Sequence, residues 1–198
     1  MADFQTLITN RRSIYALGAK VELTQDEVTK IIQNCLLNAP SAFNSQSARL
    51  VVLYGQSYHS FWKMVEGVLQ KIVPENSFDV TKRRINSFSS GVGTILFFED
   101  ETVIHGLKEK MPTYADRFSI WAEQSNAMLQ YMIWSALAEK DIGASLQHYN
   151  PLIDVEVHQM FELPLNWRLI AQMPFGSIEA SANSKVVDAI EKRFKVFA

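Results

Sequence analysis

Four short polar segments of this 198-residue chain carry side chains that could bind a charged or aromatic ligand. The first places the guanidinium groups of Arg11 and Arg12 beside the hydroxyl of Ser13. Such groups hold a phosphate by bidentate, charge-assisted hydrogen bonds. The alternative is structural, because arginines that follow a helix complement the negative end of its dipole. The segment alone leaves both interpretations open.

The second segment contains Pro40, Ser41, Asn44 and Gln46. Side-chain amides offer a hydrogen-bond donor and an acceptor together, which suits the alternating donors and acceptors on the pyrimidine edge of a flavin. Proline, serine and asparagine also form ordinary turns. A turn without a ligand is therefore the competing interpretation of these residues.

The third and fourth segments lie in the second half of the chain. Gln147 and His148 share one short loop, where an amide and an imidazole could line a site, although a single loop histidine is more often structural. Phe175 and Gly176 end an apolar run and are followed by Lys185. The glycine would permit close backbone approach to a ligand and the lysine could reach a phosphate, or the glycine simply ends a strand.

Common catalytic and metal-binding motifs are absent from the sequence. It contains no G-x-S-x-G nucleophile motif and no G-x-x-x-x-G-K-[ST] phosphate loop. Gly91 and Gly93 begin a G-x-G, but Leu96 stands where the dinucleotide fingerprint needs glycine. The four histidines do not cluster with acidic residues at metal-ligand spacing, and Cys35 is the only cysteine, so no metal site is expected. No side chain stands out as a catalytic group.

Apolar patterns predict the helices that would position these segments. Thr24 and Glu27 form a capping box, and an apolar stripe at helical spacing follows them until Pro40. Further helical patterns lie at about residues 3–10, 58–73 and 114–140, with weaker signals at 154–161. The apolar part of the long helix, residues 128–138, is too short to cross a bilayer.

Three short apolar runs, at residues 49–54, 94–98 and 167–173, predict strands. Few strands, many helices and long connections favour an α+β fold with a mixed sheet covered on both faces. No repeat or linker divides the chain, so one domain over residues 1–198 is expected.

The overall composition limits the classes of partner. Hydrophobic residues make up 47% of the chain and charged residues 20%, which is typical of a globular protein. Nineteen basic and 21 acidic residues give a formal charge of −2, which argues against nucleic acid as the main partner. The single cysteine and the lack of an apolar leader lead us to expect a cytoplasmic protein with no membrane association.

The order and spacing of the polar segments resemble the nitroreductase family of flavoproteins. Residues 10–13 (N-R-R-S) are similar to the family's opening R-R-S-x-R motif. Residues 39–46 (A-P-S-A-F-N-S-Q) are similar to its P-S-x-x-N-x-Q motif, about thirty residues later. The resemblance covers nearly the whole chain. Its short length, with S-L-Q-H-Y-N at residues 145–150 and R-F-K-V-F at 193–197, looks like the small bacterial and fungal branch.

The resemblance implies a mainly antiparallel sheet flanked by helices in three layers, and an intertwined homodimer with FMN at the subunit interface. Residues 11–13 would hold the FMN phosphate and ribityl chain, and residues 40–46 would surround the isoalloxazine, in part from the partner subunit. The full set of implied FMN-binding residues is Arg11, Arg12, Ser13, Tyr15, Pro40, Ser41, Asn44, Gln46, Gln147, His148, Phe175, Gly176, Lys185 and Arg193. Tyr15 departs from the family motif, which has arginine there, so another basic residue must replace that charge.

The resemblance also implies an activity. NAD(P)H would pass a hydride to FMN, and a nitroaromatic or quinone-like acceptor would then take it, so the flavin carries the chemistry and the protein supplies binding and orientation. This accounts for the lack of an evident acid–base pair, because hydride transfer depends mainly on alignment. One alternative is a flavin-binding stress or regulatory protein with only incidental reductase turnover. Another is a helical interaction domain without flavin.

Two apolar segments favour a dimer on independent grounds. The long helix is apolar around most of its circumference between residues 128 and 137, and residues 185–197 carry Val186, Phe194 and Phe197. Large exposed apolar patches usually mark an interface in soluble proteins. We therefore expect the C-terminal segment to dock, either on its own subunit or on a neighbour.

Overall fold

A central antiparallel sheet organises the computed structural model, which describes residues 3–197. Its strands are β1 (Leu17–Gly18), β2 (Ala48–Tyr54), β3 (Gly93–Asp100), β4 (Gly143–Ala144) and β5 (Trp167–Ile178). They follow the order β1-β5-β3-β2, and β4 pairs with β5 outside this path. The paired strands are antiparallel, which confirms the expected α+β class with a mainly antiparallel sheet.

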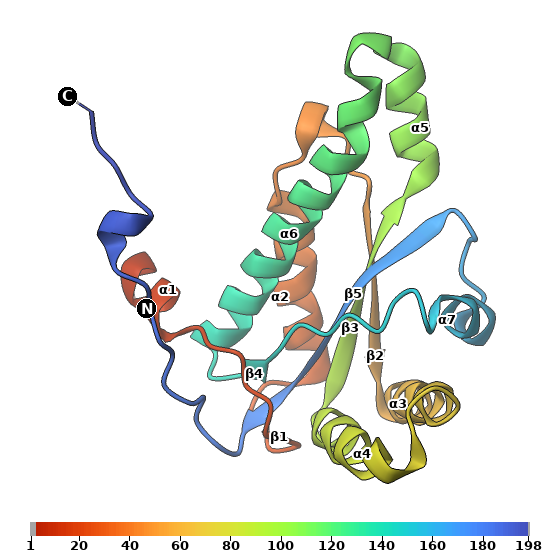
Figure 1. Cartoon of the computed structure of the whole chain (residues 1–198), viewed down its shortest axis with the longest axis vertical. Coiled ribbons are helices and arrows are strands. Elements are labelled where there is room, and N and C mark those ends of the chain that lie inside the picture. The colour runs from red at the N-terminus through yellow and green to blue at the C-terminus, as the bar shows by residue number, and fades with distance from the viewer. Residues whose placement is uncertain (1–2, 198) are drawn as a thin grey trace.

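Helices cover both faces of this sheet, so the fold has three layers (Figure 1). The α-helices are α1 (Phe4–Asn10), α2 (Gln25–Asn38), α3 (Gly55–Gln70), α4 (Glu75–Ser89), α5 (Glu101–Lys110), α6 (Ala115–Glu139) and α7 (Asp154–Phe161). The short 3-10 helices are η1 (Ala42–Asn44), η2 (Pro112–Tyr114) and η3 (Ile190–Lys192). α2 and α6 pack on one face of the sheet, and α3, α4 and α7 lie on the other.

Strand β3 lies in the middle of the sheet and has all of its side chains buried. Ile95 and Phe97 pack in the core beneath α2 and α6, whereas Leu96 and Phe98 pack in the core beneath α3 and α7. Successive side chains of a strand point to opposite faces. A strand covered on both faces therefore shows a continuous apolar run, and this is why the sequence predicted it.

The predicted capping box is present at the start of α2. Thr24 Oγ1 accepts a hydrogen bond from Glu27 N at 3.3 Å, and Glu27 Oε2 accepts one from Thr24 N at 2.8 Å. Val28, Ile32 and Cys35 follow on the buried face. The predicted long helix is α6, which has 25 residues. Of the residues that the structure describes, none belongs to a helix long and apolar enough to cross a membrane.

The three predicted strands correspond to β2, β3 and β5, and β3 and β5 extend beyond their predicted ends. The predicted helices correspond to α1, α2, α3 and α6, and the weak signal at 154–161 is α7. The sequence patterns missed α4 and α5, and they also missed the two-residue strands β1 and β4.

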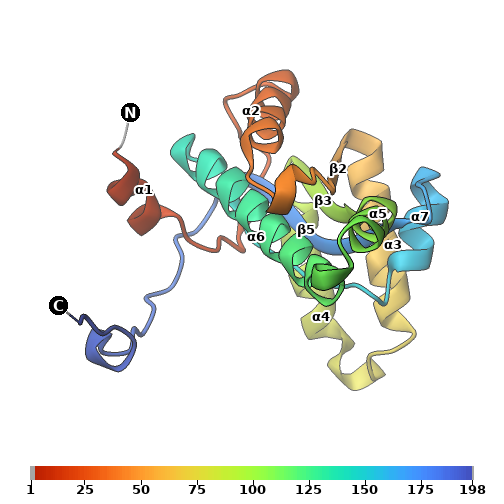
Figure 2. The same ribbon diagram turned by 90° about the horizontal axis from the view of Figure 1, so that it is seen from above.

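Residues 179–197, here called the C-terminal arm, extend beside α1 and away from the body of the chain (Figure 2). Val186 is 100% exposed and Phe197 is 91% exposed, although both are apolar. A hydrogen bond from Arg12 Nη2 to the carbonyl of Asn183, 2.5 Å long, ties the first part of the arm to the body. Residues 183–197 are exposed in the single chain, which does not show the docking that the sequence predicts.

Candidate functional site

Nine of the fourteen predicted ligand-binding residues line two separate pockets, and the other five lie outside both. The first, here called the arginine pocket, has a volume of about 460 Å³ and lies beside the end of α1. Its lining residues are Arg11, Arg12, Ser13, Tyr15, Ala16, Ala180, Ser181, Ala182, Asn183 and Lys185. The first predicted segment and Lys185 therefore lie together, although they come from opposite ends of the chain.

Two aromatic rings of α6 hold Arg11. Its guanidinium carbon lies 4.2 Å from the centroid of the Trp134 ring and 5.7 Å from that of Tyr131. Such stacking favours the cation and fixes the plane of the guanidinium. Arg11 Nε and Nη1 are buried and find no hydrogen-bond partner among residues 3–197. A cation with unused donors in the wall of a pocket is suited to binding an anion.

Backbone pairing fixes the arginine pocket to the sheet. Ser13 forms a parallel bridge with Ala144 of β4, and Ile14 N donates to Ala144 O at 2.9 Å. Because β4 itself pairs with β5, this edge of the pocket moves with the sheet. The backbone on this side of the pocket is therefore held in place by the sheet.

Gln147 and His148 lie in the loop that follows β4, a few residues beyond the bridge to Ser13. Gln147 and Gln172 of β5 exchange backbone hydrogen bonds of 2.7 and 2.9 Å. The side-chain amide of Gln147 donates to Ser145 Oγ at 3.0 Å. The side chain of His148 is exposed. Both residues are close in sequence to the edge of the arginine pocket, but they are outside its lining.

Phe175 and Gly176 have a packing role in this fold. Phe175 is fully buried, and its ring packs edge-on against Tyr54 with 5.9 Å between centroids. A Cβ at Gly176 would lie 2.4 Å from the carbonyl oxygen of Gly18 and 2.8 Å from Cα of Gly91. The close approach of these backbone segments accounts for the glycine without any ligand.

Tyr15, Lys185 and Arg193 differ in their relation to the arginine pocket. Tyr15 is 54% exposed, and its ring lies 6.4 Å from that of Phe88 on α4. Lys185 lines the pocket. Arg193 follows η3 in the exposed part of the C-terminal arm and is outside that lining. Of the two late cations, Lys185 is thus the one that lies beside Arg11 and Arg12.

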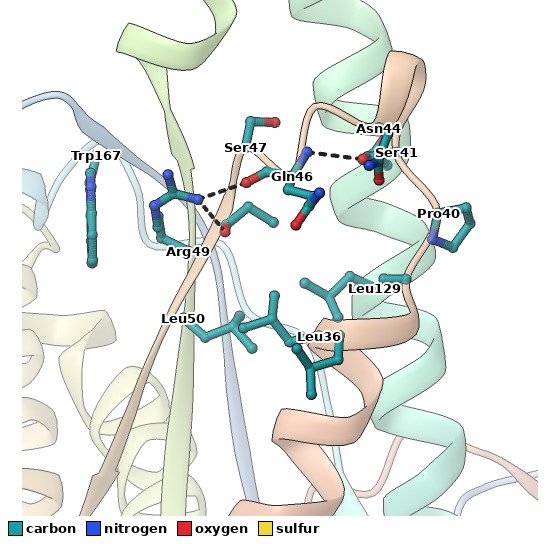
Figure 3. Close-up of a pocket in the computed structure, with 14 residues that line it drawn as sticks. Leu36, Pro40, Ser41, Asn44, Gln46, Ser47, Arg49, Leu50, Leu129 and Trp167 are labelled. Atoms are coloured by element: carbon teal, nitrogen blue, oxygen red, sulfur yellow. Dashed lines mark hydrogen bonds between the residues drawn. The ribbon is translucent and has the colours of Figure 1, made fainter.

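The second pocket, here called the loop pocket, has a volume of about 430 Å³ and lies between α2, β2 and α6 (Figure 3). Its lining residues are Leu36, Leu37, Ala39, Pro40, Ser41, Asn44, Gln46, Ser47, Ala48, Arg49, Leu50, Ser125, Leu129 and Trp167. The four predicted site residues of the second segment, Pro40, Ser41, Asn44 and Gln46, are among them. Leucines form one side and amides and hydroxyls another, a combination that suits a planar ring with a polar edge.

The loop that carries these amides has an unusual backbone. Phe43, Asn44 and Gln46 have φ angles of 55°, 52° and 49°, a region that residues other than glycine seldom occupy. Ser41 Oγ accepts a hydrogen bond from Gln46 N at 3.0 Å, and Ser125 Oγ on α6 accepts another backbone N–H of the loop at 3.3 Å. Strain held in this way is typical of functional loops.

Sequence reasoning missed several residues that line the pockets. Arg49 is one of them, and its Nη2 pairs with Asp100 Oδ2 at 2.9 Å while its Nη1 donates to the Gln46 carbonyl at 2.8 Å. Its guanidinium carbon lies 5.9 Å from the centroid of the Trp167 ring (Figure 3). Its position just after the second segment is the signal that could have found it. The other missed residues include Ser47, Ser125, Trp167, Ser181 and Asn183.

The two pockets are separate within one chain. Among the described residues they share no lining side chain. Arg11 stacks on Trp134, whereas the second segment bonds to Ser125, so the two contacts are roughly 14 Å apart along α6 at about 1.5 Å per residue. Figure 1 shows η1 beside the upper half of α6 and α1 beside its lower end. One chain therefore does not bring the implied FMN ligands into one cavity.

Comparison of the sequence with known proteins finds nitroreductases. The family model described as "Nitroreductase family" matches residues 8–177. The nitroreductase FRM2 of Saccharomyces cerevisiae is 32% identical over 178 residues, which are 88% of this chain and 87% of that protein.

Solved structures agree with these sequence matches. Nitroreductase CinD from Lactococcus lactis, in complex with nicotinic acid, is 40% identical with a TM-score of 0.92, over 99% of this chain and 100% of that one. Its complex with 4-nitrophenol is 39% identical, with a TM-score of 0.90 and the same coverage. A structure from Exiguobacterium sibiricum in complex with FMN has the same fold, with a TM-score of 0.74, 13% identity, and coverage of 100% of this chain and 98% of that one.

Proposed function

Because the chain belongs to the nitroreductase family and is an oxidoreductase of that type, we propose that it binds FMN, takes a hydride from NAD(P)H and delivers it to nitroaromatic or quinone-like acceptors. The similarity to CinD supports this choice of substrates, because CinD has been solved with the pyridine ring of nicotinic acid and with a nitrophenol. A structure of the same fold that contains FMN supports the choice of cofactor.

The residues of the arginine pocket fit the phosphate of FMN. Arg11 has unpartnered donors there, and Arg12, Ser13 and Lys185 add further donors around the same cavity. The chain has no Rossmann fingerprint to hold the second phosphate and adenosine of FAD, so FMN is the better match. Bound FMN would supply the ring that accepts and returns the hydride.

The residues of the loop pocket fit the isoalloxazine end of the cofactor. Asn44 and Gln46 offer amide donors and acceptors, and Leu36 and Leu50 offer apolar contacts for a flat ring. These side chains would orient the ring and exclude water from one of its faces, which is the contribution that hydride transfer needs from a protein.

The observation that carries the proposal is the division of these residues between two pockets of one chain. We propose that a homodimer unites them, with the arginine pocket of one subunit facing the loop pocket of the other. The exposed apolar residues along α6, Ile120, Met128 and Tyr131, support this arrangement because they lie on the helix that separates the pockets. The apolar C-terminal arm supports it as well.

An absorbance spectrum of the purified protein tests the cofactor. We expect a yellow protein that releases FMN, and not FAD, when it is denatured, as chromatography of the released flavin would show. Colourless protein that takes up no added FMN would contradict the cofactor assignment and favour an interaction domain without flavin.

The rate of reduction separates an enzyme from a flavin-binding regulatory protein. We expect NAD(P)H to bleach the flavin rapidly under anaerobic conditions, and a quinone or nitroaromatic to restore the colour. Turnover slower than about 1 s⁻¹ with either nucleotide would favour the regulatory alternative, because enzymes of ordinary efficiency work at about 1–10³ s⁻¹.

A further inference from the structure

Two side chains hold the backbone of Gln46 from either side of its Cα. Its N–H donates to Ser41 Oγ at 3.0 Å, and its carbonyl accepts a hydrogen bond from Arg49 Nη1 at 2.8 Å. Gln46 has a φ angle of 49° and belongs neither to a helix nor to a strand. A residue other than glycine keeps this left-handed conformation only where its surroundings hold it. Ser41 and Arg49 provide that hold at the two peptide groups of Gln46.

The guanidinium of Arg49 is itself anchored to the sheet. Its Nη2 pairs with Asp100 Oδ2 at 2.9 Å, and its Nη1 also donates to the carbonyl of Ala48 at 3.0 Å. The Asp100 side chain is only 12% exposed, and its Oδ1 accepts hydrogen bonds from Thr102 N at 3.0 Å and from Asn166 Nδ2 at 2.7 Å. Because this carboxylate is held where β3 ends and α5 begins, the guanidinium that it binds has a fixed position and orientation.

The backbone of Gln46 determines where its side-chain amide lies. Gln46 and Arg49 both line the loop pocket, and Figure 3 shows the Gln46 side chain in the space between Arg49 and Pro40. A rotation about φ or ψ of Gln46 would carry its amide away from this place. Residues that bind a ligand must be held to within about 0.5 Å by the residues that support them. Arg49 gives such support through the carbonyl of Gln46.

We propose that Arg49 is a positioning residue of the proposed flavin site and that it acts by holding the Gln46 amide toward the edge of the isoalloxazine. The inference rests on the proposed function, in which the loop pocket binds that end of FMN. Arg49 acts through the shape of its guanidinium, which bonds one carboxylate and two carbonyl groups at the same time. Its charge is paired with that of Asp100.

The alternative is that Arg49 only ties β2 to the end of β3 and supports the fold as a whole. The two roles differ in how Arg49 is coupled to Gln46. A positioning residue matters for FMN binding only while the Gln46 amide is present, whereas general support of the fold matters equally without that amide. A double-mutant cycle measures this difference.

The test measures the Kd of FMN for the apoprotein by fluorescence titration, in wild type, Arg49→Met, Gln46→Ala and the double variant. We expect each single variant to raise the Kd about tenfold, the usual scale for one hydrogen bond, and the double variant to bind FMN as Gln46→Ala does. Arg49→Lys keeps the charge but lacks the planar fork, so it should also raise the Kd. In the FMN-loaded protein, Arg49→Lys and Gln46→Ala should both lower the midpoint potential of the flavin, because a donor that stabilises the anionic reduced ring is displaced.

Arg117→Met is the matched control, because it removes the same charge from an exposed residue of α6 that is outside the lining of the loop pocket. It should leave the Kd and the potential unchanged. Thermal unfolding of each apoprotein shows whether it is folded, and Arg49→Lys replaces Arg49→Met in the cycle if the latter is not. An equal loss of affinity with and without the Gln46 amide overturns the inference, as does an Arg49→Lys protein with wild-type Kd and potential. Wild-type apoprotein that binds no FMN instead overturns the proposed function.

Discussion

At the scale of single residues, neighbouring arginines of one motif have different surroundings. Arg11 lies against Trp134 and Tyr131 with unused donors, whereas Arg12 donates to the Asn183 carbonyl of the C-terminal arm. Stacking makes Arg11 a fixed element of the pocket wall, and lysine could not replace it there because its ammonium group lacks a planar face. Arg12 lines the proposed phosphate site and also bonds to the arm. A substitution of Arg12 should therefore affect both the phosphate site and the position of the arm.

Arg12→Ala is expected to weaken FMN binding by about 1.5–3 kcal/mol, which is roughly ten- to hundredfold in Kd, because a hydrogen bond to a charged group is lost. Fluorescence titration of the apoprotein with FMN measures this. Lys192→Ala is the matched control, since it removes a cation of the arm that is outside the lining of the arginine pocket. Equal affinity in wild type and Arg12→Ala would favour the purely structural interpretation of the arginines.

Glu99 makes the stability of the protein depend on pH. Its folded pKa is raised above the ordinary value of 4.5 by burial, so the native state holds the proton more tightly than the unfolded chain. The stability that it contributes is therefore complete below pH 4.5 and is lost as pH rises through the folded pKa. Urea unfolding at a series of pH values should show Glu99→Gln gaining relative to wild type as pH rises. A constant difference would mean that folding does not raise the pKa of Glu99.

At the scale of elements, α2 positions the loop pocket because its last turn supplies Leu36 and Leu37 and leads directly into the second segment. Its start is fixed by the capping box. Hydrogen bonds from the backbone and hydroxyl of Thr24 lower the pKa of Glu27 below 4.5. A depressed pKa contributes stability above the ordinary value that is lost as pH falls through the folded value.

Thr24→Ala is expected to lower the free energy of unfolding by about 1 kcal/mol at neutral pH, because one backbone N–H loses its cap. The corresponding fall in Tm is about 2–4 °C for a chain of this size. The cost should shrink below the folded pKa of Glu27, where the carboxylate half of the box is already protonated. Calorimetry over a series of pH values from 7 downward measures both effects, and a loss that stays constant through the titration of Glu27 would contradict the coupling.

The sequence identified those elements whose apolar pattern or caps were unambiguous. α2 has its capping box and β3 its continuous apolar run, and both were predicted. α4 was missed because its stripe is sparse, with only Ile85 and Phe88 fully buried amid charged residues. α5 follows β3 without a connecting loop, so its cap, Asp100, is also the last residue of the strand. β1 and β4 have two residues each and are strands only because they pair with β5. No local sequence pattern predicts that pairing.

At the scale of the whole molecule, sequence order did not reveal how the candidate site is divided. The motif segments were recognisable one by one, yet whether they share a cavity depends on where α6 lies between them. Ser125 of α6 and Trp167 of β5 join the site only through tertiary contact. Part of the apolar surface of α6 is not covered by other residues of the same chain. Met128, for example, is 44% exposed and lies beside Pro40 and Tyr131.

A second copy of the chain is the proposed cover for that surface, and it would complete the FMN site at the same time. Met128→Glu should therefore give a monomer that has lost its flavin, because a charge buried in an apolar interface is strongly unfavourable. An obligate interface of this kind buries about 2,000 Å² or more. Light scattering coupled to absorbance at micromolar concentration and pH 7 measures mass and flavin content together.

Leu165→Glu is the matched control, since Leu165 is 89% exposed on the side of α7, away from α6, and should leave both unchanged. A wild-type or Met128→Glu protein that is monomeric and still loaded with flavin would refute the shared site, because FMN would then be held by the residues of one chain.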